Sequence, residues 1–218
     1  MHDLLVIVPS RGRPESIARL ADAMAATCQG DTELLVSLDA DDPAHDTYPP
    51  GPMYQTLTGV RGVVGHLNAA AARVSGYRFL GTIGDDNVPR TPGWDTAIME
   101  TLAGTPFAFG DDLYPREPGS HPCHIFTRSE IVVALGYLGP PSLRHMFVDN
   151  AWLAWGKACG ITYLPGVTLE HLHFTQGKSP LDDTYQETVS MWDADKAAWD
   201  AYQADGLAGD IAKIRAVL

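Results

Sequence analysis

The sequence is poor in cysteine and in basic side chains, and it contains no long hydrophobic run. Its three cysteines, Cys28, Cys123 and Cys159, are an odd number without a CxxC spacing, which indicates free thiols in a reducing compartment rather than disulfides or a zinc knuckle. No apolar run approaches the roughly 18 residues of a membrane span. The short, acidic start before Pro9 does not have the pattern of a signal peptide. We therefore expect a cytoplasmic protein without a membrane span.

The charge balance is acidic, with 15 lysines and arginines against 27 aspartates and glutamates and a formal net charge of −12. Nonspecific binding of DNA or RNA needs a basic surface, so the composition argues against a nucleic-acid partner. A small anionic ligand is compatible with it, because a few local arginines and a metal ion can bind such a ligand. With 218 residues and 45% hydrophobic content, the chain is long enough for one domain with a substantial core.

Strand and helix patterns alternate in the first half of the chain. They predict strands at residues 4–8, 33–38 and 77–83, helices at 14–27 and 67–74, and a loop rich in Pro and Gly from 43 to about 59. This order is typical of an α/β fold with a largely parallel sheet and helices on both faces. Ligands of such sheets bind beyond the carboxyl ends of the strands. Here those ends carry polar residues, so we expect a site at this rim.

The second half is less regular. It predicts helices at 92–102, 129–135, 149–159 and 181–204, short strands at 106–110 and 123–127, and an extended segment at 161–173. We find no repeat, low-complexity tract or linker, so we expect a single domain over residues 1–218. Within it we expect a nucleotide-binding half at about 1–90, an acceptor-side and metal-completing half at about 91–180, and C-terminal helices at 181–218.

Two adjacent carboxylates, Asp85 and Asp86, follow the predicted strand at 77–83. A strand that ends in such a pair delivers two hard oxygen ligands to the rim of the sheet, where a divalent cation and a phosphate can meet. The sequence Gly84–Asn87 is also good turn composition, so a solvated turn is the alternative. The position after a strand of a parallel sheet favours the functional interpretation.

Arg11 and Arg13 lie between the first strand and the first helix. Backbone donors at a helix start favour an anion, and arginine adds charge and a planar donor fork. The alternative is a pair of solvated loop arginines. Two arginines around a glycine at this junction favour contact with a nucleotide or phosphate.

Three residues of the second half are candidates for catalysis or metal binding. An extended segment places His171 and His173 on one face, and histidine is a common ligand of borderline metals, although one of the two can act by orienting a ligand. Asp149 begins a predicted helix, where it can cap the helix, act as a general base, or do both. Trp152 and Trp155 on that helix are expected in the core.

Taken together, these pieces resemble the GT-A fold glycosyltransferases, most closely the large family 2 group, over roughly residues 4–100 with weaker similarity to about 180. The opening Val6–Arg11 is similar to the family's first strand, and Asp39 resembles its nucleobase-contacting acid. The helix start Gly65–Ala69 is similar to a family motif whose arginine is missing here. The acidic pair with Asn87 resembles the family's DxD-type motif.

The resemblance implies a GT-A-like (Rossmann-like) fold and a set of site residues. Asp85 would face the ribose, Asp86 would hold the metal, and His173 would complete the metal site, while Asn87 and His171 are left open as further ligands. Asp149 occupies the place of the acceptor-side acid. The residues predicted to bind the nucleotide-sugar are Pro9, Ser10, Arg11, Arg13, Asp39, Asn68, Asp85 and Lys178, the last from a loop that closes over the donor.

The implied function is a metal-dependent glycosyltransferase of the hexosyltransferase type, which uses Mn²⁺ or Mg²⁺. Its donor would be a nucleotide-sugar, with a UDP-sugar favoured, and its acceptor is open among a glycan, a protein and a small molecule. Asp149 as base implies inversion, whereas a retaining enzyme needs no such base. The alternatives are a nucleotidyltransferase or metal-dependent hydrolase on a similar sheet, or a noncatalytic nucleotide-sugar-binding protein. A nucleotidyltransferase usually has a Lys-bearing Gly-rich loop, and a metal-dependent hydrolase usually clusters several His and Asp ligands.

Overall fold

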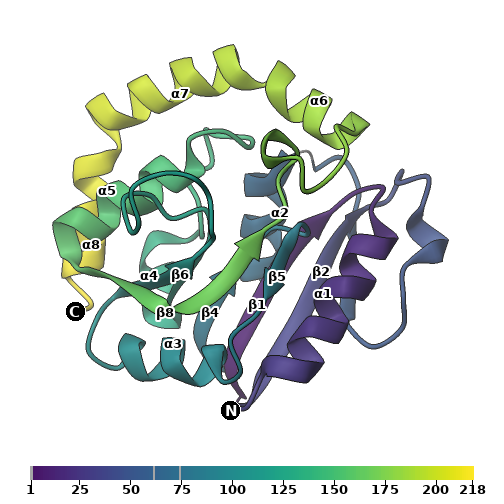
Figure 1. Cartoon of the computed structure of the whole chain (residues 1–218). Helices are drawn as coiled ribbons and strands as arrows, with labels where there is room; N and C mark the ends of the chain where they lie inside the picture. Colours follow the sequence, from purple (N-terminus) through teal and green to yellow (C-terminus); the bar gives the residue numbers. More distant parts are fainter. Residues whose placement is uncertain (1, 61, 74) are drawn as a thin grey trace.

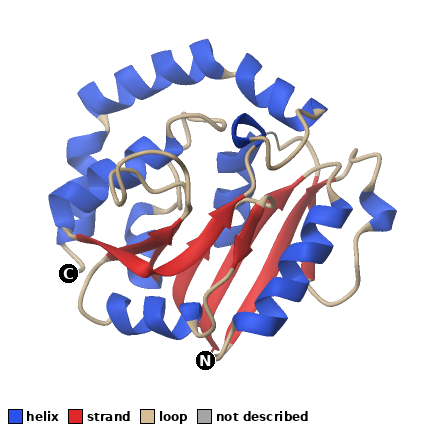
Figure 2. Ribbon diagram, viewed as in Figure 1, coloured by secondary structure: helices blue, strands red, loops and turns tan. Residues whose placement is uncertain are grey.

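An eight-stranded mixed sheet forms the centre of the molecule (Figures 1 and 2). The computed structural model describes residues 2–60, 62–73 and 75–218. In the order β3-β2-β1-β4-β7-β6-β8-β5, the strands are Met53–Leu57, Thr32–Asp39, His2–Ser10, Tyr77–Thr82, Ile125–Arg128, Phe107–Asp111, Ile161–His171 and Asn87–Pro89. The first four are parallel. β7 is antiparallel to β4 and β6, β8 is parallel to β6, and β5 is antiparallel to β8. The predicted mostly parallel α/β sheet is confirmed.

The central strand β1 is buried on both faces. Leu4, Val6 and Val8 point into one hydrophobic cluster, while Leu5 and Ile7 point into the other. This alternation follows from the two-residue period of a strand, and it explains why the sequence reads as a continuous apolar run.

Helices cover each face of the sheet. Residues of α1 (Pro14–Thr27) and α3 (Trp94–Leu102) belong to the first cluster. Residues of α2 (Gly62–Ala71), α4 (Ser129–Leu135), α5 (Val148–Cys159), α7 (Trp192–Asp205) and α8 (Leu207–Arg215) belong to the second. Trp152 and Trp155 of α5 are 3% and 1% exposed, as the predicted core position requires. Together with α6 (Asp183–Ser190), α7 and α8 curve around one side of the molecule (Figure 1).

Several predicted boundaries were wrong. The loop predicted at 43–59 contains the short helix His45–Thr47 and β3, whose mostly exposed residues lack the apolar signature of an inner strand. β5 was missed because it has three residues and ends in Pro89, which an edge strand tolerates. The single terminal helix at 181–204 is two helices, followed by α8. The helix predicted at 67–74 begins at Gly62 and ends at Ala71, and Val74 lies outside the described residues.

Among the described residues, no helix has both the length and the apolar character needed to span a bilayer.

Candidate functional site

A cavity of about 520 Å³ lies at the rim where β1, β2 and β4 end. Residues after these strands form one wall, and residues of α5, β8 and α6 form the others. Eleven candidate site residues line it: Pro9, Ser10, Arg11, Arg13, Asp39, Asp85, Asp86, Asn87, Asp149, His171 and His173. The structure therefore brings together side chains from positions 9 to 173 at the rim that the parallel sheet predicts.

The acidic pair lies in a tight turn that Asn87 closes. The Asn87 side chain accepts a hydrogen bond from the Gly84 backbone N–H at 2.8 Å and donates one to the Leu169 carbonyl at 3.1 Å. A Cβ on Gly84 would lie 2.4 Å from Asp86 Oδ1, so a larger residue here would displace the Asp86 carboxylate. The turn and the functional interpretation are thus compatible. Asn87 is 1% exposed, and its amide is engaged in holding the turn.

Asp85 faces the wall formed by β1 and the loop that follows it. Ser10 Oγ donates a hydrogen bond to it at 2.8 Å, and an Arg13 guanidinium nitrogen lies 2.8 Å from its other oxygen. Burial raises the pKa of Asp85 to about 6, because the charge of Arg13 offsets the desolvation only in part and Asp86 lies nearby.

Asp86 faces the opposite wall. Tyr185 donates its hydroxyl to Asp86 Oδ2 at 2.6 Å, and His171 Nε2 lies 3.1 Å from the same oxygen. Burial alone would raise the pKa of Asp86, but His171 and Tyr185 stabilise the ionised carboxylate and hold the pKa well below its usual range.

The donor set around Asp86 fits a divalent cation. The rings of His171 and His173 have centroids 5.0 Å apart, so the two predicted histidines lie together in the cavity that Asp86 also lines. His171 contacts Asp86, whereas His173 Nδ1 lies 2.8 Å from Thr175 Oγ1. A carboxylate with imidazole nitrogens suits Mn²⁺, and a carboxylate alone also suits Mg²⁺.

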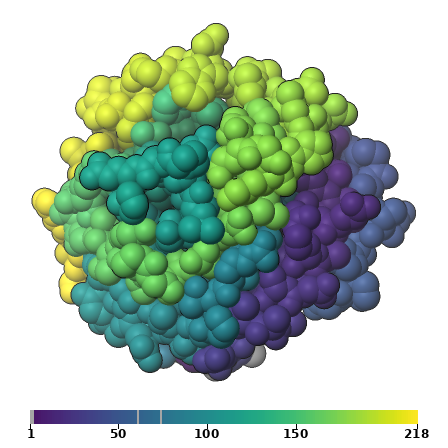
Figure 3. All heavy atoms as spheres, viewed as in Figure 1, coloured from purple at the N-terminus to yellow at the C-terminus, as the bar shows by residue number. Residues whose placement is uncertain are grey.

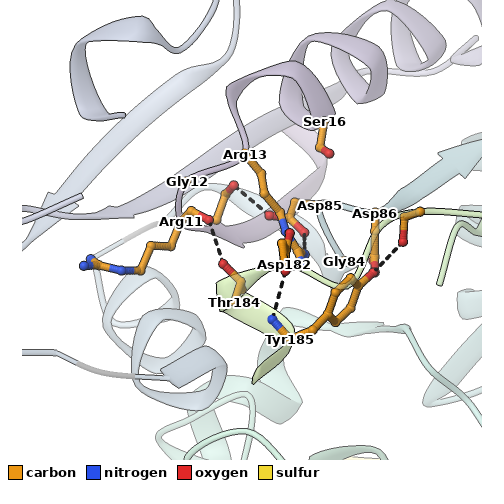
Figure 4. A network of polar contacts seen from close by, with 12 residues as sticks. Arg11, Gly12, Arg13, Ser16, Gly84, Asp85, Asp86, Asp182, Thr184 and Tyr185 are labelled. Atoms are coloured by element: carbon orange, nitrogen blue, oxygen red, sulfur yellow. Dashed lines mark hydrogen bonds and ion pairs between the residues drawn. The ribbon is translucent and has the colours of Figure 1, made fainter. Parts of the chain in front are cut away.

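Arg13 is held by three groups (Figure 4). Its Nη1 contacts Asp85, while its Nε and Nη2 each donate a hydrogen bond of 2.7 Å to Asp182. Its guanidinium carbon lies 4.2 Å from the ring centroid of Tyr185. Asp182 also caps α6 by accepting a hydrogen bond from the Tyr185 backbone N–H. The start of α6 therefore lies over the acidic pair, and in the space-filling view its green atoms pack directly against the purple N-terminal residues (Figure 3).

Arg11 points to the other side of this rim. One guanidinium nitrogen lies 3.2 Å from Asp39 and 2.8 Å from Asp41. His66 Nε2 lies 3.2 Å from Asp39, and the other ring nitrogen of His66 contacts Ser37 at 2.8 Å. Asp39 is thus a buried acid with a fixed orientation at the end of β2, where the resemblance expects a base-contacting residue.

Asp149 also lines the cavity, in the first turn of α5. The helix begins after Phe147, whose φ of 66° places it in the left-handed region, so Asp149 is not the N-cap. Its Oδ2 lies 2.7 Å from His121 Nε2. The ring of Phe147 packs on Trp192 with centroids 4.9 Å apart, and this half-exposed tryptophan lines the cavity.

Two predicted nucleotide-sugar ligands lie outside the cavity lining. Asn68 donates to the Gly139 carbonyl and accepts from the backbone N–H groups of Leu138 and Gly139, so its amide holds the segment after α4. Lys178 is ion-paired with Glu170 at 2.9 Å. Their side chains are engaged in these contacts, and their nucleotide-sugar roles stay predictions.

Two cavity residues, Tyr185 and His121, and a neighbouring residue, Asp182, had no counterpart in the sequence prediction. Asp182 precedes a helix, so its capping role is readable from the sequence, but its ion pair with Arg13 spans 169 positions. Tyr185 and His121 carry no local signal. Their importance comes from contacts with Asp86 and Asp149 that only the tertiary structure shows.

The fold is similar to those of several solved structures at low sequence identity. A mannosyltransferase from Pyrobaculum calidifontis in complex with GDP-Man and Mn²⁺ has 14% identity and a TM-score of 0.59, covering 98% of this chain and 79% of that chain. Glucosyl-3-phosphoglycerate synthase from Mycobacterium tuberculosis in complex with Mn²⁺, UDP and phosphoglyceric acid has 14% identity and a TM-score of 0.62, covering 88% and 77%.

TarS 1–349 of S. aureus has 14% identity and a TM-score of 0.58, covering 77% of this chain. The match spans 60% of that protein fragment, less than two thirds of its length. No protein-family model and no curated protein sequence matches the chain. The similarity of structure, with the sheet order described above, shows that the chain is a single α/β domain with a GT-A-like fold, the fold of these glycosyltransferases.

Proposed function

We propose that the protein is a metal-dependent glycosyltransferase that moves a hexose from a nucleotide-sugar, with a UDP-sugar favoured, to an acceptor. The observation that carries the proposal is that Asp85 and Asp86 line one cavity, with Arg13 in contact with the first and His171 in contact with the second. The two similar structures in complex with GDP-Man or UDP also contain Mn²⁺, which supports the same requirement here.

The residues divide the work of donor binding. Arg11 and Arg13 would bind the diphosphate by charge-assisted hydrogen bonds, and Asp39 with Asp85 would contact the base and ribose. Asp86 and His173 would hold the cation, which when bound stabilises the negative charge of the departing nucleoside diphosphate. To bind phosphate, Arg13 must give up at least part of its contact with Asp182, because all three of its guanidinium nitrogens already donate to carboxylates.

On the acceptor side, Asp149 would take the proton from the attacking hydroxyl, which implies inversion of configuration. His121 holds its carboxylate at 2.7 Å and thereby fixes the oxygen that faces the cavity. His121 is therefore a positioning residue. The apolar surface of Phe147 and Trp192 beside it provides a place for the body of the acceptor.

A panel of sugar nucleotides incubated with Mn²⁺ tests the function, with product analysis by mass spectrometry and no added acceptor. Slow release of free sugar and nucleoside diphosphate, lost in Asp86→Ala and in EDTA, supports a glycosyltransferase. Release of pyrophosphate or nucleoside monophosphate instead indicates a nucleotidyltransferase or hydrolase. Tight donor binding without any turnover, even with a broad acceptor mixture, indicates a noncatalytic nucleotide-sugar-binding protein.

A further inference from the structure

A second group of metal-binding side chains lies beside the acidic pair. A carboxylate oxygen of Asp112, the sulfur of Cys123 and a ring nitrogen of His171 all lie within 4.8 Å of one another. Asp112 follows β6, Cys123 precedes β7 and His171 ends β8, so the three come from separate segments that meet at the same end of the sheet. The glycosyltransferase chemistry proposed above uses neither Asp112 nor Cys123.

The ring of His171 has one nitrogen that is free to bind a metal ion. Its Nε2 is 3.1 Å from Asp86, whereas its Nδ1 is buried and has no hydrogen-bond partner among the described residues. If Nε2 carries the proton and donates it to Asp86, Nδ1 presents a lone pair. Metal-binding histidines commonly donate their second ring N–H to a carboxylate in this way, which fixes the tautomer.

The sulfur of Cys123 has a neighbour suited to a thiolate. His124 Nε2 accepts a hydrogen bond from the Gly110 backbone N–H at 3.0 Å, so a neutral His124 carries its proton on Nδ1. That Nδ1 lies 3.4 Å from Cys123 Sγ and can donate to it. An N–H directed at the sulfur stabilises a negative charge there, as metal coordination would create.

The carboxylate of Asp112 is held in place by two hydrogen bonds, and its oxygens can still bind a metal ion. Its Oδ1 accepts from the Tyr114 backbone N–H at 3.0 Å, and its Oδ2 accepts from Arg116. Each carboxylate oxygen can accept more than one interaction, so both partners are compatible with a metal ligand. Asp112 is 6% exposed, and these contacts leave its side chain little freedom to turn away.

We propose that Asp112, Cys123 and His171 form a Zn²⁺ site distinct from the donor-metal site at Asp86. Sulfur, nitrogen and oxygen ligands together favour a borderline metal such as Zn²⁺ over Mg²⁺ or Mn²⁺. The thiol releases its proton to solvent as the Zn–S bond forms, and no electron is transferred. Cys123 and His171 both line the main cavity, so the fourth position is open to a water molecule from it.

The proposed site links the end of β6, the start of β7 and the end of β8. It also immobilises the imidazole that hydrogen bonds to Asp86. The two sites would therefore be adjacent but chemically different: the harder one takes the cation that accompanies the nucleotide, and the softer one takes zinc.

Co²⁺ is a suitable probe, because its bond to a thiolate produces a near-ultraviolet charge-transfer absorption that Zn²⁺ then removes by displacement. The full chain is stripped with EDTA under reducing conditions and titrated with Co²⁺. We expect one equivalent to produce the thiolate band. The band should disappear in Cys123→Ser and persist in Cys28→Ser and Cys159→Ser, which are matched controls elsewhere in the chain.

Asp86→Asn separates the two sites, because an amide oxygen can still accept the His171 N–H. It should retain the Co²⁺–thiolate band while losing Mn²⁺-dependent nucleotide binding. Absence of the band from the wild type, or its persistence in Cys123→Ser, would overturn the zinc site. If Cys123→Ser does not fold, alkylation of the wild-type protein decides: Zn²⁺ should slow modification of Cys123 at least tenfold without protecting Cys28, and equal modification with and without Zn²⁺ refutes the site.

Discussion

Asp85 and Asp86 are neighbours in the chain, yet they face opposite walls of the cavity and differ in their chemistry. Asp85 contacts Ser10 and an arginine from the β1 side, and burial raises its pKa to about 6. Asp86 contacts His171 from β8 and Tyr185 from α6, and these donors keep its pKa well below its usual range. Two identical side chains thus become different groups because different elements supply their partners.

The difference suggests how a donor is divided between the walls. The β1 wall offers guanidinium groups and is suited to phosphates and ribose. The β8 wall offers imidazoles and is suited to a cation. If this division is correct, changes on the two walls should have separable consequences for metal dependence, nucleotide affinity and stability.

The largest expected effect is on the β8 wall. Asp86→Ala should abolish the Mn²⁺-dependent part of nucleotide binding, because it removes the carboxylate that is proposed to hold the cation and that contacts His171. Calorimetry of UDP binding with Mn²⁺ and with EDTA measures this part directly. The exposed Asp200→Ala, which loses only an ion pair with Lys196, is the control for a change of charge. Equal wild-type affinity for UDP in Mn²⁺ and EDTA would remove the metal assignment.

The two late histidines give the next largest contrast. His173→Ala should strongly weaken Mn²⁺-dependent donor binding, because His173 is the proposed ligand. His171→Ala should weaken it less, because His171 acts by orienting Asp86. Titration with Mn²⁺ followed by electron paramagnetic resonance measures metal affinity in both variants. A larger loss of Mn²⁺ affinity in His171→Ala than in His173→Ala would show that His171 is the ligand and His173 is not.

On the β1 wall, Arg11→Ala should reduce nucleotide affinity by about 1–3 kcal/mol, the usual scale of a charge-assisted hydrogen bond. The melting temperature of this variant should change little, because Arg11 is partly exposed, its partner Asp41 is exposed, and His66 still contacts the buried Asp39. Calorimetry measures the nucleotide affinity, and thermal unfolding of the same preparation measures the melting temperature. Unchanged affinity with a clear loss of stability would show that Arg11 is structural.

Neutral variants of Asp85 and Asp86 should change the stability of the fold in opposite directions, measured in EDTA without nucleotide. The folded-state pKa of Asp85 is raised to about 6, so its ionised form destabilises the fold fully above that pH. This destabilisation disappears below the pKa of an unfolded aspartate, about 4. Asp85→Asn should therefore raise the melting temperature at pH 8. The pKa of Asp86 is lowered, so its ionised form stabilises the fold above about pH 4, and Asp86→Asn should lower the melting temperature at pH 8. We expect several degrees in each direction, at about 2–4 °C per kcal/mol. Shifts of the same sign would contradict the contrast.

The two walls also differ in how far the sequence predicts them. The β1 wall comes from residues that immediately follow predicted strands, and parallel pairing brings those ends together without further information. Ser10, Asp39 and Asp85 were therefore predictable by position. The apolar runs that specify these strands are local and periodic.

The β8 wall depends on contacts that no local pattern encodes. β5 has three residues, and its pairing of Asn87 with His171 positions the histidine beside Asp86. Tyr185 reaches the same carboxylate across 99 positions. The helix that carries it was predicted as part of one longer helix, because the break at Met191 has no proline or glycine to mark it. Lys178, which its polar loop predicts to bind the nucleotide-sugar, pairs with Glu170 on β8 in this structure, and its donor role stays a prediction.

The smallest expected effect joins the two walls through α6. Asp182 holds both nitrogens of the Arg13 fork and competes with a phosphate for them. Asp182→Asn keeps a good N-cap for α6 but removes the charge, so it should free Arg13 and raise nucleotide affinity a few-fold without unfolding the helix. The neighbouring exposed Asp183→Asn makes the same change of charge away from Arg13 and should leave affinity unchanged. If Asp182→Asn instead weakens binding, the contact between Asp182 and Arg13 prepares the arginine for phosphate rather than competing with it, and α6 belongs to the binding site.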